Sequence, residues 1–285
     1  MKITQIVKNI LSNYDSDNPG TKTNLCRILM HGIVGGTGKI VILPVDQGFE
    51  HGPDKSFSTN PDGYDQHYHY QLAIDAELSA YAAPLGMLEC GASEFSGQIP
   101  TILKLNSSNS LLPKSKEPDQ AFTGSVDDAL RLGCCAVGMT IYPGSGKSLG
   151  MFEEACEIIK EAKSKGLAAV IWSYPRGGEL SKIDETALET VSYGAHIAAL
   201  LGAHIIKVKS PVGNDIKHVV RACFNGKRIV VFSGGAAKSD AEILSEVQEI
   251  NDGGGNGSII GRNSFQRPRE KALLLLKQIC GIYKQ

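Results

Sequence analysis

The feature that most constrains the fold of this chain is a regular alternation of short apolar runs with segments of helical periodicity. Eight runs rich in β-branched and small apolar residues indicate strands, at residues 39–46, 80–86, 99–106, 135–142, 168–175, 204–209, 228–234 and 257–261. Between them, apolar residues that recur every three or four positions predict helices at residues 151–165, 184–202, 240–250 and 269–283. The chain therefore repeats a strand-then-helix unit.

Strands that are apolar along their length and joined by helices predict a parallel sheet with helices covering its faces. Eight such units in about 250 residues are what a (β/α)8 TIM barrel requires. The alternative is an open doubly wound sheet with an added domain, but no G-x-G-x-x-G motif follows the first strand. We therefore expect an α/β protein with a single (β/α)8 barrel domain over residues 39–285 and an N-terminal helical extension over residues 1–38.

Composition restricts the partners and the compartment. The chain has 285 residues, 42% hydrophobic and 21% charged, and its net charge of −1 offers no basic field for nucleic acid or an anionic membrane. It shows neither a long apolar window nor the apolar core of a signal peptide. The seven cysteines form no C-x-x-C pair and lie mostly in apolar stretches, as in a reducing compartment. We expect a cytoplasmic protein that binds neither nucleic acid nor membrane.

Polar side chains mark the ends of several predicted strands. The first strand ends in Asp46, the fifth carries Trp172 and Tyr174, and the sixth carries Lys207 and Lys209. In a TIM barrel the carboxyl ends of all strands meet at one rim, which is where these barrels keep their active sites. The sequence therefore predicts that these side chains converge.

The last two strand ends suggest a phosphate site. The seventh strand ends in Ser233, Gly234 and Gly235, and the eighth ends in Gly261 and Arg262. Glycine N–H groups can approach an anion closely, and an arginine adds charge. A tight turn would explain the first motif alone, but both motifs stand where TIM barrels commonly hold a phosphate. Together they predict a phosphate-binding site.

The stretch IIKVKSP, residues 205–211, places two lysines in an apolar strand. Lys207 and Lys209 are two positions apart and therefore point to the same face. Burial and a neighbouring ammonium both lower the pKa of a lysine, and the uncharged amine can form a Schiff base with a carbonyl. A structural ion pair with Asp46 or another carboxylate is the alternative. The phosphate site and Asp46 at the same rim favour a catalytic role for a lysine over a structural ion pair.

A metal-dependent reaction would draw on histidines. Of the seven in the chain only His67 and His69 are close together, and no carboxylate completes a zinc set beside them. We therefore expect no metal and no other cofactor.

Six motifs give the chain a specific resemblance to a known family. They are ILPVDQGFEHGP, TIYPGSG, IWSYPRGG, HIIKVKSP, VFSGGAA and GRNSFQR. In order and approximate spacing, from about residue 25 to the C-terminus, the chain resembles the archaeal-type class I fructose-bisphosphate aldolases, which also occur in bacteria. The resemblance implies a metal-independent lyase of glycolysis and gluconeogenesis that cleaves fructose 1,6-bisphosphate reversibly into dihydroxyacetone phosphate and glyceraldehyde 3-phosphate. It also implies a homo-oligomer.

The resemblance assigns roles to the residues at matching motif positions. It implies that Lys207 forms the Schiff base, that Tyr174 acts as acid and base, and that Asp46 belongs to the same catalytic set. It further places Ser233, Gly234, Gly235, Gly261 and Arg262 around a substrate phosphate. We also expect three other residues to bind substrate, each with an alternative: Trp172 as a wall for the iminium or as ordinary barrel packing, Arg176 at the second phosphate of a bisphosphate or as a cap of its loop, and Lys209 at a phosphate or as a charge that biases the pKa of Lys207.

Some questions stay open at this point. Lys104 is a possible partner of Asp46, and Tyr142 is a possible second acid. Gln47 stands where many archaeal members have histidine, and the segment KSPVGND lacks their Y-T-G-D motif. A related aldolase or transaldolase acting on another sugar phosphate, such as an ulosonate synthase of aromatic precursor biosynthesis, therefore remains an alternative. A non-catalytic phosphosugar-binding barrel is a further alternative, against which the intact catalytic set argues.

Overall fold

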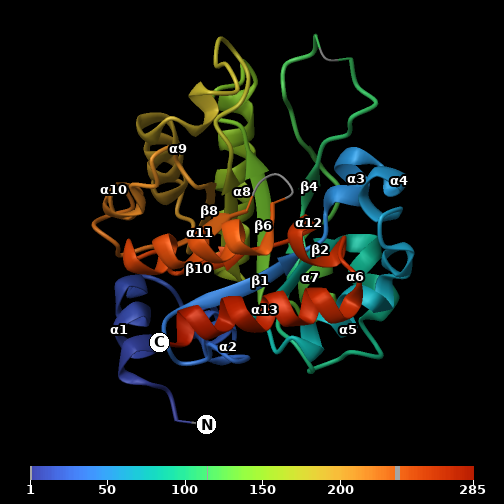
Figure 1. The fold of residues 1–285 in the computed structure, drawn as a ribbon. Coiled ribbons are helices and arrows are strands. Elements are labelled where there is room, and N and C mark those ends of the chain that lie inside the picture. The colour runs from blue at the N-terminus through green and yellow to red at the C-terminus, as the bar shows by residue number, and fades with distance from the viewer. Residues whose placement is uncertain (1, 114, 235–237) are drawn as a thin grey trace.

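The computed structural model describes residues 2–113, 115–234 and 238–285, and it contains a closed barrel of parallel strands (Figure 1). The strand order is β1-β2-β3-β6-β7-β8-β9-β10, with β10 pairing back onto β1. The strands are β1 (Ile40–Pro44), β2 (Ala80–Pro84), β3 (Thr101–Lys104), β6 (Ala136–Ile141), β7 (Ala168–Ser173), β8 (Ile205–Lys209), β9 (Ile229–Ser233) and β10 (Gly257–Ile259). The predicted TIM barrel is confirmed, and the open doubly wound sheet is wrong.

Helices surround the barrel, and the largest agree with the predicted ones. They are α5 (Gln66–Asp75), α6 (Leu85–Gly91), α7 (Val126–Arg131), α8 (Ser148–Ser164), α9 (Leu188–Leu200), α10 (Ile216–Ala222), α11 (Asp240–Asp252), α12 (Arg262–Phe265) and α13 (Arg269–Lys284). The helix predicted from residue 184 begins later, because Ala187 is extended at φ −61° and ψ 141°. The residues before it form a separate 3-10 helix, η3 (Asp184–Thr186).

The segment after β1 is largely helical. It forms two short helices, α3 (Gln47–His51) and α4 (Pro53–Phe57), and a 3-10 turn, η2 (Pro61–Tyr64). Gly52, at φ 89°, separates the two helices, a backbone conformation that glycine adopts without strain. The segment after β3 forms a small antiparallel pair of β4 (Asn106–Ser107) and β5 (Ala121–Phe122).

The alternation of side chains along each strand decides what enters the barrel. Ile40 and Ile42 of β1 belong to the interior apolar cluster, whereas Val41 and Leu43 pack against the surrounding helices. On β8 the interior position Ile205 is followed two residues later by Lys207. The pleat of β8 therefore directs Lys207 into the barrel.

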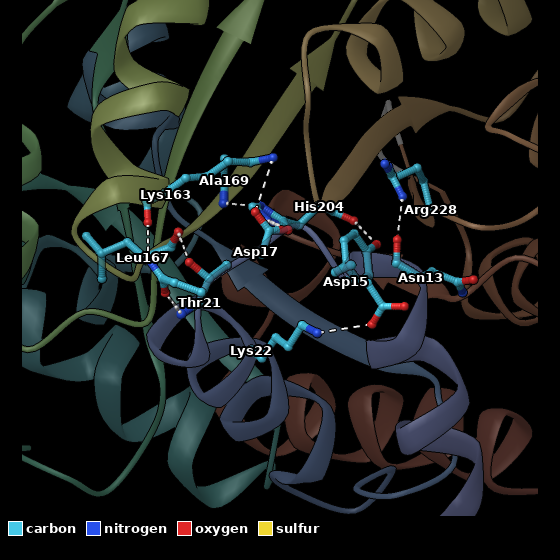
Figure 2. A network of polar contacts seen from close by, with 12 residues as sticks. Asn13, Asp15, Asp17, Thr21, Lys22, Lys163, Leu167, Ala169, His204 and Arg228 are labelled. Carbon is cyan, nitrogen blue, oxygen red and sulfur yellow. Dashed lines mark hydrogen bonds and ion pairs between the residues drawn. The ribbon is translucent and has the colours of Figure 1, made fainter.

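The N-terminal segment packs against the amino ends of the strands. It consists of α1 (Gln5–Leu11), η1 (Ser12–Tyr14) and α2 (Pro19–Met30), and its buried residues join the interior cluster. Polar contacts hold it in place: the Tyr14 hydroxyl donates to His204 O at 2.7 Å. Figure 2 shows Asp17 beside the His204 ring, to which it is bonded. No helix in the described part of the chain is long and apolar enough to cross a membrane.

Candidate active site

A cavity opens at the carboxyl ends of the strands, and most of the predicted site residues line it. These are Asp46, Tyr174, Arg176, Lys207, Lys209, Ser233, Gly234, Gly261 and Arg262. Trp172 lies next to Lys207, whereas Gly235 lies outside the described residues. The barrel thus brings together residues that are more than 200 positions apart in the chain.

Lys207 is the buried amine of this cavity. It is 5% exposed, and its ammonium lies 5.5 Å from the centre of the Trp172 ring and 5.6 Å from that of Tyr174. Burial lowers the pKa of Lys207 to about 8, against the opposing effect of Asp46 and Glu50. At neutral pH an appreciable fraction of Lys207 is therefore an uncharged amine.

The Trp172 ring fits beside Lys207 because its neighbouring strand carries a glycine. Trp172 of β7 pairs in register with Lys207 of β8, and its ring lies over Gly138 of β6. A Cβ at Gly138 would stand 2.1 Å from the ring, which is far inside van der Waals contact. Gly138 therefore makes room for the aromatic ring beside Lys207.

Tyr174 is the phenol nearest to Lys207. Burial, and then the negative charge of Asp46, raise the pKa of Tyr174, while the Arg176 guanidinium 5.0 Å from the ring centre acts in the opposite direction. The phenol is therefore protonated at neutral pH. A positive charge formed on Lys207 would lower this pKa, because it favours the phenolate.

Two carboxylates face the amine, and the sequence analysis identified one of them. Asp46 is buried at the end of β1, and Glu50 follows one turn later on α3. Burial, and then the charge of Asp46, raise the pKa of Glu50. The four-residue spacing within VDQGFEHG was the available signal, because residues i and i+4 share a helix face. His51 of the same motif also lines the cavity.

Lys104 and Tyr142 make contacts other than those considered from the sequence. The buried Lys104 ammonium donates to the backbone carbonyl of Asn106 and, at 3.1 Å, to the Asn106 Oδ1, and it lies 5.8 Å from the Trp172 ring centre. The Tyr142 hydroxyl accepts a hydrogen bond from Gln120 at 2.6 Å. Tyr142 lines an adjoining cavity rather than the one that contains Lys207.

The predicted phosphate cradle lies at the ends of β9 and β10. Ser233 and Gly234 line one side of the cavity, and Gly261 and Arg262 line the other. A Cβ at Gly261 would stand 2.8 Å from the carbonyl oxygen of Pro44, so the backbone of the two strands can approach this closely only with glycine. Backbone N–H groups without a neighbouring Cβ and the charge of Arg262 suit an anion.

The second lysine of β8 has a partner that sequence reasoning missed. The Lys209 ammonium donates to the Glu185 Oε2 at 2.9 Å, and the Arg176 Nε lies 3.7 Å from the same oxygen. Glu185 comes from η3 in the loop after β7, and its proximity depends on how that loop folds. Lys209 is therefore held toward the rim rather than toward Lys207.

The histidines that were closest in sequence have structural roles. The buried His69 Nε2 bonds to Gly63 O at 2.8 Å, and the His67 Nε2 bonds to Cys90 O at 2.9 Å. Among the described residues there is no group of three or more histidine, cysteine or acidic side chains that could hold a metal ion.

The fold and the site together define a class of protein, a TIM barrel with a buried lysine and a glycine-rich, arginine-bearing rim in one cavity at the carboxyl ends of its strands. The family model for DeoC/LacD family aldolases matches residues 40–267, and the chain belongs to this family of aldolases. It is 40% identical to "Fructose-bisphosphate aldolase class 1" of Thermoproteus tenax over 231 aligned residues, and this alignment covers 81% of this chain and 84% of that protein. The archaeal-type resemblance inferred from the motifs is thereby confirmed.

Two further similarities bear on the chemistry. A solved archaeal fructose-1,6-bisphosphate aldolase, with its catalytic lysine covalently bound to the carbinolamine intermediate of the substrate, is 37% identical at a TM-score of 0.79 and covers 87% of this chain and 95% of its own. "Fructose-bisphosphate aldolase/6-deoxy-5-ketofructose 1-phosphate synthase" of Methanocaldococcus jannaschii is 32% identical over 260 residues, covering 86% of this chain and 82% of that protein.

Proposed function

We propose that this protein is a class I fructose-bisphosphate aldolase, which cleaves fructose 1,6-bisphosphate reversibly into dihydroxyacetone phosphate and glyceraldehyde 3-phosphate. The observation that carries the proposal is the buried Lys207, with its pKa lowered to about 8, in a cavity shared with Asp46, Tyr174 and an anion cradle. The similar archaeal aldolase with a substrate-bound lysine supports the same assignment. The reaction needs no metal or other cofactor, because the iminium itself withdraws electrons.

The first half of the proposed reaction forms the Schiff base. The Lys207 amine attacks the C2 carbonyl, and Tyr174 donates a proton to the oxygen as the carbinolamine forms. The oxygen takes a second proton from the carbinolamine nitrogen and leaves as water. The resulting iminium lies beside the Trp172 ring, whose centre is 5.5 Å from the Lys207 ammonium. An aromatic face stabilises such a cation.

The second half breaks the bond between C3 and C4. The C4 hydroxyl must lose its proton, and the bonding electrons move toward the iminium to form an enamine. Tyr174 is suited to accept this proton because the new positive charge on Lys207 lowers the pKa of the phenol. Asp46 accepts hydrogen bonds from the substrate hydroxyls. Protonation of the enamine at C3 and hydrolysis then release dihydroxyacetone phosphate and regenerate the amine.

The cradle binds the phosphate nearest to the reacting carbon. The C1 phosphate is one carbon from C2, so it must lie close to Lys207, as do Ser233, Gly234, Gly261 and Arg262. Gly235, assigned to the same motif, lies outside the described residues and remains part of the proposal from sequence alone.

The test traps the covalent intermediate. The protein is incubated with dihydroxyacetone phosphate, the iminium is reduced with borohydride, and the modified peptide is identified by mass spectrometry. We expect one reduced adduct on Lys207 and none in a Lys207→Met variant, with cleavage of fructose 1,6-bisphosphate unaffected by a chelator. An adduct on Lys209 or Lys104 would refute the assignment, and the absence of any adduct would refute the mechanism.

A second candidate function has specific support. The relative from Methanocaldococcus jannaschii carries a 6-deoxy-5-ketofructose 1-phosphate synthase in its name, and the segment after Lys209 reads SPVGND instead of Y-T-G-D. An aldolase of this kind uses the same Schiff base on another sugar phosphate. Comparing cleavage rates of fructose 1,6-bisphosphate and fructose 1-phosphate with the rate of this synthesis distinguishes the two.

We also propose that the protein acts as a cytoplasmic homo-oligomer. On α9, Tyr193 and Leu200 are 69% and 65% exposed, and their seven-residue spacing places them on one helix face. Such an apolar face is suited to contact with a second copy. Light scattering that shows only the 30.4 kDa monomer would contradict the proposed oligomer.

A further inference from the structure

Three charged side chains form a cluster at the rim of the cavity, and we call it the rim cluster. It consists of Arg176 after β7, Glu185 of η3 and Lys209 at the end of β8. One carboxylate oxygen of Glu185 accepts from the Lys209 ammonium at 2.9 Å and lies 3.7 Å from the Arg176 Nε. The Glu185 side chain is 17% exposed, so solvent screens this cluster only partly.

The backbone around Glu185 is fixed relative to both cations. Val212 N donates to Thr186 O at 2.8 Å, which ties η3 to the loop that follows β8. The Arg176 guanidinium in turn lies 5.0 Å from the Tyr174 ring centre and 5.6 Å from that of Tyr142. The cluster is therefore anchored from two neighbouring strand ends.

The rim cluster faces the space through which a substrate must extend. Arg176 and Lys209 line the cavity that contains Lys207, and they also line the two open cavities on either side of it. Glu185 lines one of these outer cavities, together with Lys182. The two cations are thus common to all three spaces at the mouth of the barrel.

The geometry leaves donors available for a ligand. An ammonium has three N–H donors and a guanidinium has five. Glu185 takes one donor of Lys209 and faces the Nε of Arg176, so the terminal fork of Arg176 can still bind an anion. Because the carboxylate lies between the two cations, it offsets their mutual repulsion and allows them to stay close. One negative against two positive charges leaves a net positive cluster.

We propose that Glu185 is a positioning residue for the known reaction class: it holds Arg176 and Lys209 together so that both bind the phosphate at the far end of a bisphosphate substrate. The inference rests on the proposed function. The C1 phosphate occupies the cradle beside Lys207, and the C6 phosphate is four carbons beyond C2, which directs it outward to the rim. Glu185 thereby favours bisphosphates over ketose monophosphates.

The test compares Glu185→Gln with Glu179→Gln on two substrates. The amide keeps the size of the side chain and removes its charge, and Glu179 is an exposed glutamate in the same loop. For Glu185→Gln we expect the KM for fructose 1,6-bisphosphate to rise about tenfold, as for a weakened charge-assisted contact. The KM for fructose 1-phosphate, which lacks the distal phosphate, should change less than about twofold in both variants. Glu179→Gln should leave both values unchanged.

A double-mutant cycle with Lys209→Met supplies the second measurement. If Glu185 acts through the cations, Glu185→Gln raises the KM for the bisphosphate less in the Lys209→Met background than in the wild type. Equal changes on both substrates, an unchanged KM or a lowered KM for the bisphosphate would each overturn the proposal. A wild-type protein that fails to cleave fructose 1,6-bisphosphate would refute the proposed function instead.

Discussion

At the scale of single residues, the balance of charges around Lys207 decides how much of it is a free amine. Burial lowers its pKa, Asp46 and Glu50 raise it, and Arg176 and Arg262, with smaller effects, lower it. The result, about 8, lies close enough to neutral pH for attack on a carbonyl, whereas the ordinary value of 10.5 would leave almost no free amine.

This balance predicts the pH dependence of Schiff-base formation. Below a pH of about 8 the fraction of free amine falls tenfold for each pH unit, so the rate of trapping by borohydride at fixed dihydroxyacetone phosphate should rise with pH and level off above 8. Asp46→Asn removes a negative charge that favours the ammonium and should move the midpoint to lower pH. A midpoint near 10.5, or a shift of Asp46→Asn to higher pH, would contradict this account.

At the scale of elements, the packing of β6 against β7 positions the aromatic ring beside Lys207. Gly138 of β6 lies under the Trp172 ring of β7, and that ring contacts Lys207 of β8. Three consecutive strands are therefore coupled through one aromatic side chain. A substitution on β6 should therefore alter the surroundings of the Lys207 amine, although Gly138 itself takes no part in the reaction.

The corresponding prediction concerns Gly138→Ala. Since a Cβ would stand 2.1 Å from the ring, Trp172 must move, which should destabilise the fold by about 1–3 kcal/mol and slow adduct formation on Lys207. Trp172 is the single tryptophan of the chain, so its fluorescence maximum reports the displacement directly. Gly150→Ala on α8 is the control, because a Cβ there meets nothing within 4 Å. Unchanged fluorescence and activity in Gly138→Ala would refute the coupling.

The elements also show what the sequence could and could not predict. The eight strands followed from their apolar runs, and Lys207 and Tyr174 followed from their positions at strand ends. Helix α3 has five residues, so its only sequence signal for Glu50 is the single four-residue spacing from Asp46, without a longer helical period to support it. The partner of Lys209 depends on the folding of the loop after β7, and no local pattern connects Glu185 to a lysine 24 positions away.

At the scale of the whole molecule, the N-terminal segment closes the end of the barrel opposite the cavity. Figure 2 shows Asp17 bonded to His204, and Thr21 beside Leu167, the residue before β7, whose carbonyl it reaches. Asn18 donates to the Lys163 carbonyl in the last turn of α8. Tyr14 accepts from Ile229 N at 3.2 Å and so also contacts the start of β9. We propose that residues 1–38 extend the single barrel domain of residues 39–285 rather than fold apart from it.

The junction of this segment with the barrel predicts how stability depends on pH. His204 Nδ1 accepts from Ala169 N at 2.8 Å, so its Nε2 carries the proton and donates to Asp17 at 3.0 Å. Burial lowers the pKa of His204, against the effect of Asp17, so the folded ring resists a second proton that the unfolded chain accepts below a pH of about 6.5. Stability conferred by the neutral ring is therefore present above that pH and is lost as the pH falls through 6.5 toward the lowered value.

The measurement is the free energy of unfolding in urea at pH of about 7.5 and about 5.5. We expect the wild type to be less stable at the lower pH, and His204→Gln to be less stable at the higher pH but to lose less between the two, because glutamine does not titrate. Part of the loss of stability at low pH should persist in His204→Gln, because burial also lowers the pKa of His69 to about 4, and this second buried histidine destabilises the fold at low pH in the same way. His218→Gln on α10 controls for replacing a histidine elsewhere. An equal loss in the wild type and in His204→Gln would show that the junction does not govern acid sensitivity, and the closure of the barrel by residues 1–38 would then have to rest on its apolar contacts alone.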